Sequence, residues 1–260
     1  MYFKRLLALP FLWVIAFVTG MVLLFDSVYF SAFLRTEIGI VKLLAFLGAF
    51  GAAMSFERGA YLRRAWLLIG ACMLFLLLRD ALVALEIPGI TIISAVLVTA
   101  GNLVQVIGTW LLARSWSVAE LALPGTRGKQ WMVLAAAIVF ALIVAGPPLA
   151  ENAKALFSGD LSQMTSLASG AGDIISLCLI APLLLTALAL RGGMLAWPWS
   201  LITISYVSWL FYDASSFYAP MLHLQSQQVR ALSEVFRTFG CLFQFSAGMS
   251  QRHVTRLLRS

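Results

Sequence analysis

The stretch Arg58–Ala81 reads RGAYLRRAWLLIGACMLFLLLRDA, in which a cluster of arginines precedes an apolar run that reaches Arg79 and Asp80. The apolar run extends from Ala65 to Leu85, which is about the 20 residues that an α-helix needs to cross the hydrocarbon of a bilayer. We therefore expect a transmembrane helix with basic residues at one end and an acidic residue close to the other.

The composition extends this expectation to the whole chain. Of the 260 residues, 62% are hydrophobic and 11% are charged, and the mean hydropathy is +0.95. A soluble domain carries roughly 25% charged residues. These values exclude soluble, disordered, collagen-like, disulfide-rich and soluble nucleic-acid-binding proteins. They predict an all-α, polytopic integral membrane protein in contact with the lipid bilayer.

Eight stretches are read as transmembrane helices, although the last three are shorter or carry polar residues. They are 6–25, 38–56, 65–85, 90–113, 131–150, 174–190, 199–218 and 232–249. The sixth is short, so we expect it to recruit residues 170–173 as its first turn. That would put Asp173 at a helix N-terminus, where a carboxylate interacts favourably with the helix dipole.

The placement of basic residues predicts the orientation, because short loops rich in Lys and Arg stay in the cytoplasm. Twelve basic residues fall inside when eight spans alternate from an inner N-terminus: Lys4, Arg5, Arg58, Arg63, Arg64, Arg114, Arg127, Lys129, Arg191, Arg252, Arg256 and Arg259. Only two acidic residues, Glu57 and Glu120, accompany them. We therefore expect both termini in the cytoplasm. The net charge of +7 reflects this topology and does not imply nucleic acid as a partner.

The chain contains an internal repeat. At an offset of 133 residues, nine of the 24 positions from Arg58 to Ala81 are identical in the second copy, among them Arg58, Trp66 and Asp80, which pair with Arg191, Trp199 and Asp213. A second block at an offset of 139 pairs Thr99, Gly101, Leu103 and Gln105 with Thr238, Gly240, Leu242 and Gln244. We predict two parallel four-helix repeats, residues 1–127 and 128–260, within one membrane domain.

Ionisable residues inside the spans are the first candidates for function, because charge at membrane depth is costly. The candidates lie toward the predicted outer side, and they are Asp80, Asp213, Arg79, Arg237 and Glu234. The two aspartates are equivalent in the repeat, so a symmetric outer vestibule that binds a ligand or ion is one interpretation. The alternatives are that the aspartates only reach the headgroup region, or that they form structural salt bridges. Glu234 and Arg237, three residues apart, can also pair with each other.

Amide side chains form a second group of candidates. Asn102, Gln105 and Gln244 are predicted to lie within spans, and each Gln stands four residues after a Gly on the same helix face. Hydrogen bonds between packed helices account for such residues. A role in contacting a ligand is the alternative for Gln105 and Gln244.

The sequence lacks the motifs of several kinds of cofactor and metal site. Only His223 and His253 are present, so paired axial histidines for a haem are lacking, and no cluster of His, Cys and carboxylates has the spacing of a zinc site. The three cysteines are expected to pack as small apolar residues. Lys42, near an outer helix end, is a poor candidate for a retinal Schiff base. We expect no cofactor, no metal and no enzymatic activity.

Three stretches resemble the multi-span sensory input modules of bacterial histidine kinases and diguanylate cyclases, known as membrane-associated sensor domains. They are Gly101-Asn102-Leu103 running on to Trp110–Arg114, Gly172-Asp173 followed by Ala181–Leu185, and Trp66 through Asp80. The likeness covers about a third of the chain. It implies a multi-pass protein of the bacterial cytoplasmic (inner) membrane that senses a signal. One departure is that the sequence stops at Ser260 without an output domain.

This departure leaves three expectations. The first is a receptor-like or accessory module with a polar site near the outer face, acting through partner proteins in the membrane or cytoplasm. The second is a structural or assembly subunit of a larger membrane complex. The third is a small transporter or channel, which the parallel repeat favours, although we expect its spans to lack the Gly- and Pro-interrupted helices common in transporters.

Overall fold

The computed structural model describes residues 2–25, 27–85, 90–118, 127–160, 163–190, 193–223 and 226–259. These residues form eight α-helices and a short 3-10 helix, and they contain no strand, which confirms the all-α prediction for the described part of the chain. The helices are α1 (Tyr2–Leu24), α2 (Phe30–Met54), α3 (Tyr61–Ala84), α4 (Ile90–Val118), α5 (Arg127–Phe157), α6 (Met164–Ala189), α7 (Ala196–Tyr218), η2 (Ala219–Leu222) and α8 (Ser226–Leu257).

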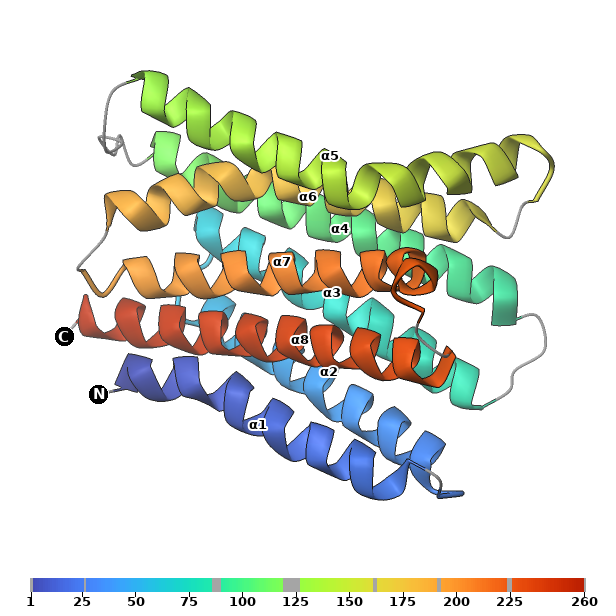
Figure 1. The fold of residues 1–260 in the computed structure, drawn as a ribbon. Coiled ribbons are helices and arrows are strands. Elements are labelled where there is room, and N and C mark those ends of the chain that lie inside the picture. The colour runs from blue at the N-terminus through green and yellow to red at the C-terminus, as the bar shows by residue number, and fades with distance from the viewer. Residues whose placement is uncertain are drawn as a thin grey trace.

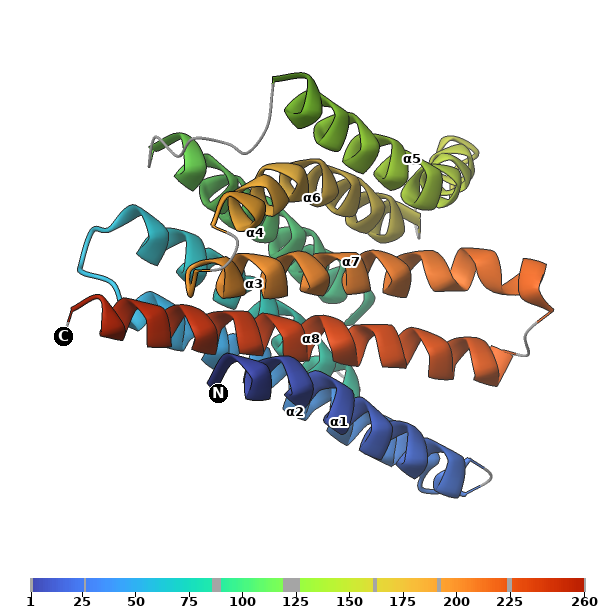
Figure 2. The ribbon, with the colours of Figure 1, turned by 60° about the vertical axis from the view of Figure 1, so that its left-hand side comes forward.

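Six of the helices form a ring. Going around it, α2 packs against α3, α3 against α4, α4 against α6, α6 against α7, α7 against α8, and α8 against α2. The other two helices flank the ring from outside, α1 mainly on α8 and α5 mainly on α6, and they lie at opposite edges of the bundle (Figures 1 and 2). The two ends of the chain lie at the same end of the bundle (Figure 1). We call the opposite end the distal end.

The bundle has an apolar surface, and polar side chains lie among the apolar ones in its interior. Large apolar side chains such as Leu12, Ile15 and Val22 are more than half exposed on the outside. Hydroxyl side chains such as Thr109 and Ser205 are fully buried between helices. Among the described residues, the six helices α1 to α6 are long and apolar enough to cross a membrane. A multi-pass membrane protein accounts for both observations.

The helices α7 and α8 are not among these six candidate spans. Helix α8 is buried by its neighbours α1, α2 and α7, and it turns polar side chains toward them. The buried polar residues of α8 are Glu234, Arg237, Thr238, Gln244, Ser246, Ser250, Gln251 and Thr255. Its low hydropathy therefore reflects polar contacts inside the bundle and does not indicate exposure to water.

Small residues let α2 and α8 approach closely. A Cβ atom built on Gly48 of α2 would lie 2.6 Å from the Cα atom and 2.7 Å from the carbonyl oxygen of Phe245 on α8. A Cβ atom on Gly248 of α8 would in turn overlap the carbonyl group of Gly48. Close backbone contact at paired glycines is a frequent mode of helix packing in membranes.

Several helix boundaries differ from the sequence-based prediction. Helix α2 begins at Phe30, about two turns before the predicted start at residue 38, and α8 extends from Ser226 to Leu257 instead of 232–249. Helix α6 begins at Met164, so the prediction that Asp173 occupies a helix N-terminus is wrong. Asp173 lies inside α6 because the Ser- and Gly-containing segment before it is also helical, and its side chain lies outside the described residues.

Helix α5 is bent at prolines in its interior. It contains Pro147 and Pro148, directly after Gly146, and α6 contains Pro182. Proline removes a backbone hydrogen bond and bends a helix. Figure 2 shows the change of direction in α5, whose last turns are seen almost end-on. Helix α5 thus carries Gly and Pro inside a candidate span, although it is a continuous helix from Arg127 to Phe157.

Candidate ligand-binding site

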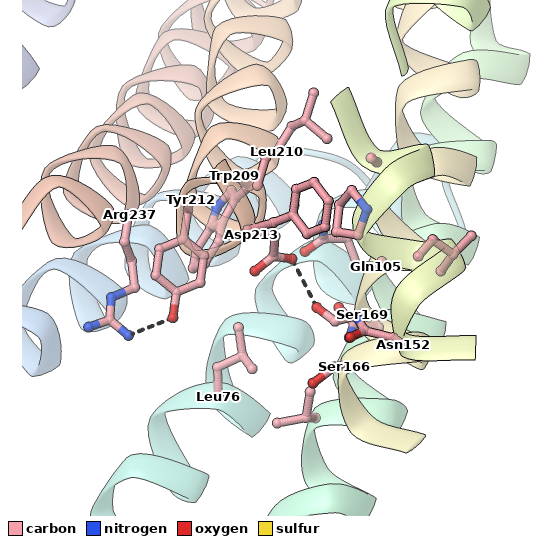
Figure 3. Close-up of a pocket in the computed structure, with 18 of the residues that line it drawn as sticks. Leu76, Gln105, Asn152, Ser166, Ser169, Trp209, Leu210, Tyr212, Asp213 and Arg237 are labelled. Carbon is pink, nitrogen blue, oxygen red and sulfur yellow. Dashed lines mark hydrogen bonds between the residues drawn. The ribbon is translucent and has the colours of Figure 1, made fainter. Parts of the chain in front are cut away.

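The distal half of the bundle contains a pocket of about 510 Å³. Its lining residues come from the parts of α2 to α8 that lie away from the ends of the chain, with Gln163 just before α6 as the exception (Figures 1 and 3). This volume falls in the range of about 300–1,000 Å³ that is usual for small-molecule sites. The lining is mixed: the side chains of Leu76, Trp209, Leu210 and Phe217 are apolar, and many of the others are charged or carry amides and hydroxyls.

One group of charges joins α2, α3 and α4 at the pocket. Asp80 forms an ion pair with Lys42, and its other oxygen accepts a hydrogen bond of 2.8 Å from Arg79. Arg79 also donates to the hydroxyl of Ser94 over 3.0 Å. Lys42 and Arg79 line the pocket, whereas Asp80 lies behind them and holds both. The ion pair of Asp80 with Lys42 joins α3 to α2, as the alternative of a structural salt bridge between helices expects, although Lys42 was not among the predicted partners.

A second group of charges joins α7 and α8. Arg237 pairs with Glu234 one helical turn away, which confirms the expectation that these two residues can neutralise each other. Arg237 also donates to the phenol oxygen of Tyr212 over 3.3 Å, and its guanidinium carbon lies 5.1 Å from the centre of that ring. Arg237 and Glu234 are both buried. Arg237 lines the pocket from α8, and Glu234 stands behind it.

Asp213 contributes a carboxylate to the lining from α7. It accepts a hydrogen bond of 3.0 Å from the hydroxyl of Ser169 on α6, and Figure 3 shows its side chain directed toward that serine. Asn152 and Ser166 line the same part of the pocket. Asp213 thus lines the pocket directly, while its repeat partner Asp80 acts through Lys42 and Arg79. The two predicted equivalents therefore occupy different surroundings.

The amide side chains separate into two cases. Asn102 and Gln105 line the pocket from α4, and the carbonyl of Gln105 accepts a hydrogen bond of 3.0 Å from the thiol of Cys72 on α3. Gln105 therefore makes the predicted hydrogen bond between helices and also faces the pocket. Gln244 is buried on α8, and it does not belong to the described lining.

Three lining residues carry an N–H group that lacks an acceptor among the described residues. These groups are the side-chain amide of Asn102, the indole N–H of Trp209 and Nε of Arg237. Buried N–H groups in folded proteins nearly always have an acceptor. These three groups are enclosed by protein atoms, and the indole nitrogen of Trp209 faces Gly240 of α8, so they mark imperfect hydrogen bonding in the wall of the pocket.

Glu37 on α2 is a further buried carboxylate, and the sequence analysis did not include it. It accepts hydrogen bonds from the indole of Trp13 on α1, at 3.3 Å, and from the hydroxyl of Thr238 on α8, at 2.9 Å. It lies outside the lining of the 510 Å³ pocket and ties α1 to the ring. It was missed because it stands one residue before the apolar run that was taken as the second span.

Other chemistries find no support in the described part of the chain. No group of three or more His, Cys, Asp or Glu side chains is arranged there to hold a metal ion. Cys72, Cys178 and Cys241 form no disulfide. No protein-family model, curated protein or solved structure matches this chain.

Proposed function

We propose that this chain is a receptor-like membrane module that binds a small polar molecule in the distal pocket and acts through partner proteins. The observation that carries the proposal is the lining, in which three cations and a carboxylate share one cavity with amides and hydroxyls. Burying charge between membrane helices is costly, so such groups mark sites of function by default. Structural salt bridges alone would not require a cavity beside them.

The proposed topology has eight spans, with both termini in the cytoplasm of a bacterium and the pocket toward the outer face of the inner membrane. Its support is the distribution of basic side chains. Lys4, Arg5, Arg58, Arg114 and Arg256 all belong to helix ends or turns at the end of the bundle where the chain begins and ends. The positive-inside rule assigns that end to the cytoplasm. The pocket then faces the side from which an external signal arrives.

The proposed pair of four-helix repeats draws support from the order of helices in the ring. Moving three places around the ring exchanges α2 with α6, α3 with α7, and α4 with α8, which are the counterparts that the repeat predicts. Equivalent residues also make equivalent contacts: Gly101 lies against Cys72, and the carbonyl of Gly240 accepts a hydrogen bond of 2.7 Å from Ser205. The outer helices deviate, because α1 leans mainly on α8 whereas α5 leans mainly on α6.

A variant that blocks the pocket tests the proposed function. Ser166 is exposed and lines the pocket, so Ser166→Trp fills the cavity without disturbing the core. Ser158→Trp is the matched control, since Ser158 is exposed at the end of α5 and does not belong to the lining. The full chain in detergent is heated with representatives of five ligand classes: L-leucine, succinate, spermidine, glucose and inorganic phosphate.

Binding to the folded state stabilises a protein, by about 2.7 kcal/mol at roughly 100 times the Kd. We expect at least one compound to raise the unfolding temperature of the wild-type protein and of Ser158→Trp, and to leave that of Ser166→Trp unchanged. Stabilisation that persists in Ser166→Trp would overturn the assignment of the pocket, and a lack of stabilisation by every class would overturn the receptor function.

A transporter is the second candidate, and the shape of α5 is the observation that favours it. Pro148 follows Gly146 and Pro147 in the interior of this helix, and Pro148 lines the pocket. Interrupted helices beside a central site are typical of transporters. Flux into liposomes distinguishes the two functions: a transporter accumulates the compound that binds, whereas a receptor binds it without flux.

A further inference from the structure

The charged side chains that line the pocket, taken together with the carboxylates that pair with them, are balanced in number and come from different helices. The cations Lys42, Arg79 and Arg237 come from α2, α3 and α8, while Asp213 enters from α7. Behind the cations, Asp80 pairs with Lys42 and Arg79, and Glu234 pairs with Arg237. These six side chains therefore comprise three cations and three carboxylates. A ligand with a net charge would upset this balance in a medium of low dielectric constant, where an uncompensated charge is costly.

The cations that line the pocket indicate what one end of the ligand must be. Arg237 lines it from α8, and its side chain is buried. Lys42 and Arg79, which share one carboxylate, are donors as well. A carboxylate accepts several hydrogen bonds and carries the charge that these cations attract.

The other side of the pocket recognises the opposite charge. Asp213 can only accept hydrogen bonds when it is ionised, and the side-chain carbonyl of Asn152 and the hydroxyl of Ser166 add further acceptors nearby. An ammonium group donates three hydrogen bonds and matches this set. Leu76, Leu210 and Phe217 also line the pocket and provide an apolar part of its wall for the body of a ligand.

Together these features point to one class of ligand. We propose that the pocket binds a zwitterionic amino acid with an apolar side chain, with its carboxylate toward Lys42, Arg79 and Arg237 and its ammonium group toward Asp213. This inference rests on the proposed function of the pocket as a ligand site. A zwitterion offers a partner to each charge and leaves the net charge of the cluster unchanged. The pocket volume of about 510 Å³ leaves room for such a molecule.

Three probes of nearly equal shape test the proposal on the full chain in detergent. L-Leucine carries both charges, 4-methylpentanoate lacks the ammonium group, and 3-methylbutylamine lacks the carboxylate. Isothermal titration gives the Kd of each for the wild-type protein. We expect L-leucine to bind at least about tenfold more tightly than either analogue. Equal or tighter binding of an analogue would refute the proposal that the ligand is a zwitterion. This comparison uses only the wild-type protein, so it does not depend on whether any variant folds.

Two variants then test which side chains bind the ammonium end and the carboxylate end of the ligand. Asp213→Asn is expected to weaken the binding of L-leucine by about tenfold. The Kd of 4-methylpentanoate should not change, because that analogue has no ammonium group to contact Asp213. Arg79→Gln is expected to weaken the binding of L-leucine and of 4-methylpentanoate, and to leave the Kd of 3-methylbutylamine unchanged. Glu151→Gln and Arg35→Gln are the matched controls, since both residues are exposed and neither belongs to the lining.

The failure of this inference is distinguishable from the failure of the proposed function. If succinate, spermidine, glucose or phosphate binds in a way that Ser166→Trp abolishes, and L-leucine does not bind, the pocket is a ligand site of another class and the zwitterion is excluded. The same holds if a co-purified phospholipid occupies the pocket and L-leucine does not displace it. If none of the five classes binds, both proposals fail together.

Discussion

The crossing of α2 and α8 allows a sharp test of the packing, because two glycines of α2 differ only in what faces them. Gly48 faces the backbone of Phe245, while a Cβ atom on Gly39 would meet nothing within 4 Å. Both glycines lie inside the same helix. Gly48→Ala and Gly39→Ala are therefore the same substitution in the same helix, with and without a neighbour.

The structure sets the size of the effect. Ordinary van der Waals contact of a Cβ atom begins near 3.4 Å, and the Cα atom of Phe245 would lie at 2.6 Å, so α8 must move by about 0.8 Å. Overpacking of this kind costs about 1–3 kcal/mol, and the upper end applies because a backbone atom cannot turn aside as a side chain can. Alanine recovers about 1 kcal/mol of helix propensity. The net loss expected for Gly48→Ala is about 2 kcal/mol, whereas Gly39→Ala should gain about 0.5–1 kcal/mol.

The assay compares apparent unfolding temperatures in one detergent, measured as the fraction of protein that stays monodisperse after heating. A loss of 2 kcal/mol corresponds to a fall of about 4–8 °C for a chain of this size. We expect Gly48→Ala to unfold at a lower temperature than the wild-type protein, and Gly39→Ala at the same or a higher temperature. If Gly48→Ala is as stable as Gly39→Ala, the helices do not meet at these backbones and the described ring is not closed between α2 and α8.

Two further predictions concern the buried charges and the topology. Removing one partner of a buried ion pair leaves the other charge uncompensated, so Glu234→Gln should destabilise the protein by about 3–5 kcal/mol. The double variant with Arg237→Met should recover part of this loss. If the losses of the two substitutions add up in the same thermal assay, the pairing of Glu234 with Arg237 is contradicted. For the topology, Ser158→Cys should react with an impermeant maleimide in intact cells and Glu57→Cys only after the membrane is opened, and the reverse pattern would refute the proposed orientation.

The sequence predicted the helices well because each depends on a local apolar run. The apolar segments that begin near Leu6, Ala65 and Trp131 are all helical in the structure, and so is the polar segment from Leu232 to Met249. The last of these was supported by its similarity to the segment that contains Thr99 and Gln105. Of the candidate site residues, Arg79, Asp213, Arg237, Asn102 and Gln105 line the pocket. Their prediction rested on charge or amides within apolar runs, which a sequence shows directly.

Lys42 and Glu37 could not be assigned in the same way. Glu37 follows Arg35 and Thr36, and this polar cluster looked like the edge of a span. Lys42 was expected near an outer helix end, whereas it is the middle residue of α2. Their burial depends on α8 and α1, which are close in space but distant in sequence. The pocket itself depends on the ring order of six helices, which apolar periodicity does not encode.

The buried polar face of α8 has a consequence for how the protein is made. A single arginine at the centre of a membrane helix costs about 2.5–3.5 kcal/mol on insertion scales, and α8 carries Glu234 and Arg237 besides its buried amides and hydroxyls. In the eight-span arrangement that we propose, α8 would partition poorly into lipid alone. Its partners α2 and α7 precede it in the chain, so they are synthesised first and can offer the side chains of Glu37 and Tyr212 in a groove between them. Membrane integration of α8 is then a step of folding as much as of translocation, and cells expressing variants with a damaged groove should accumulate chains whose last helix stays outside the bilayer.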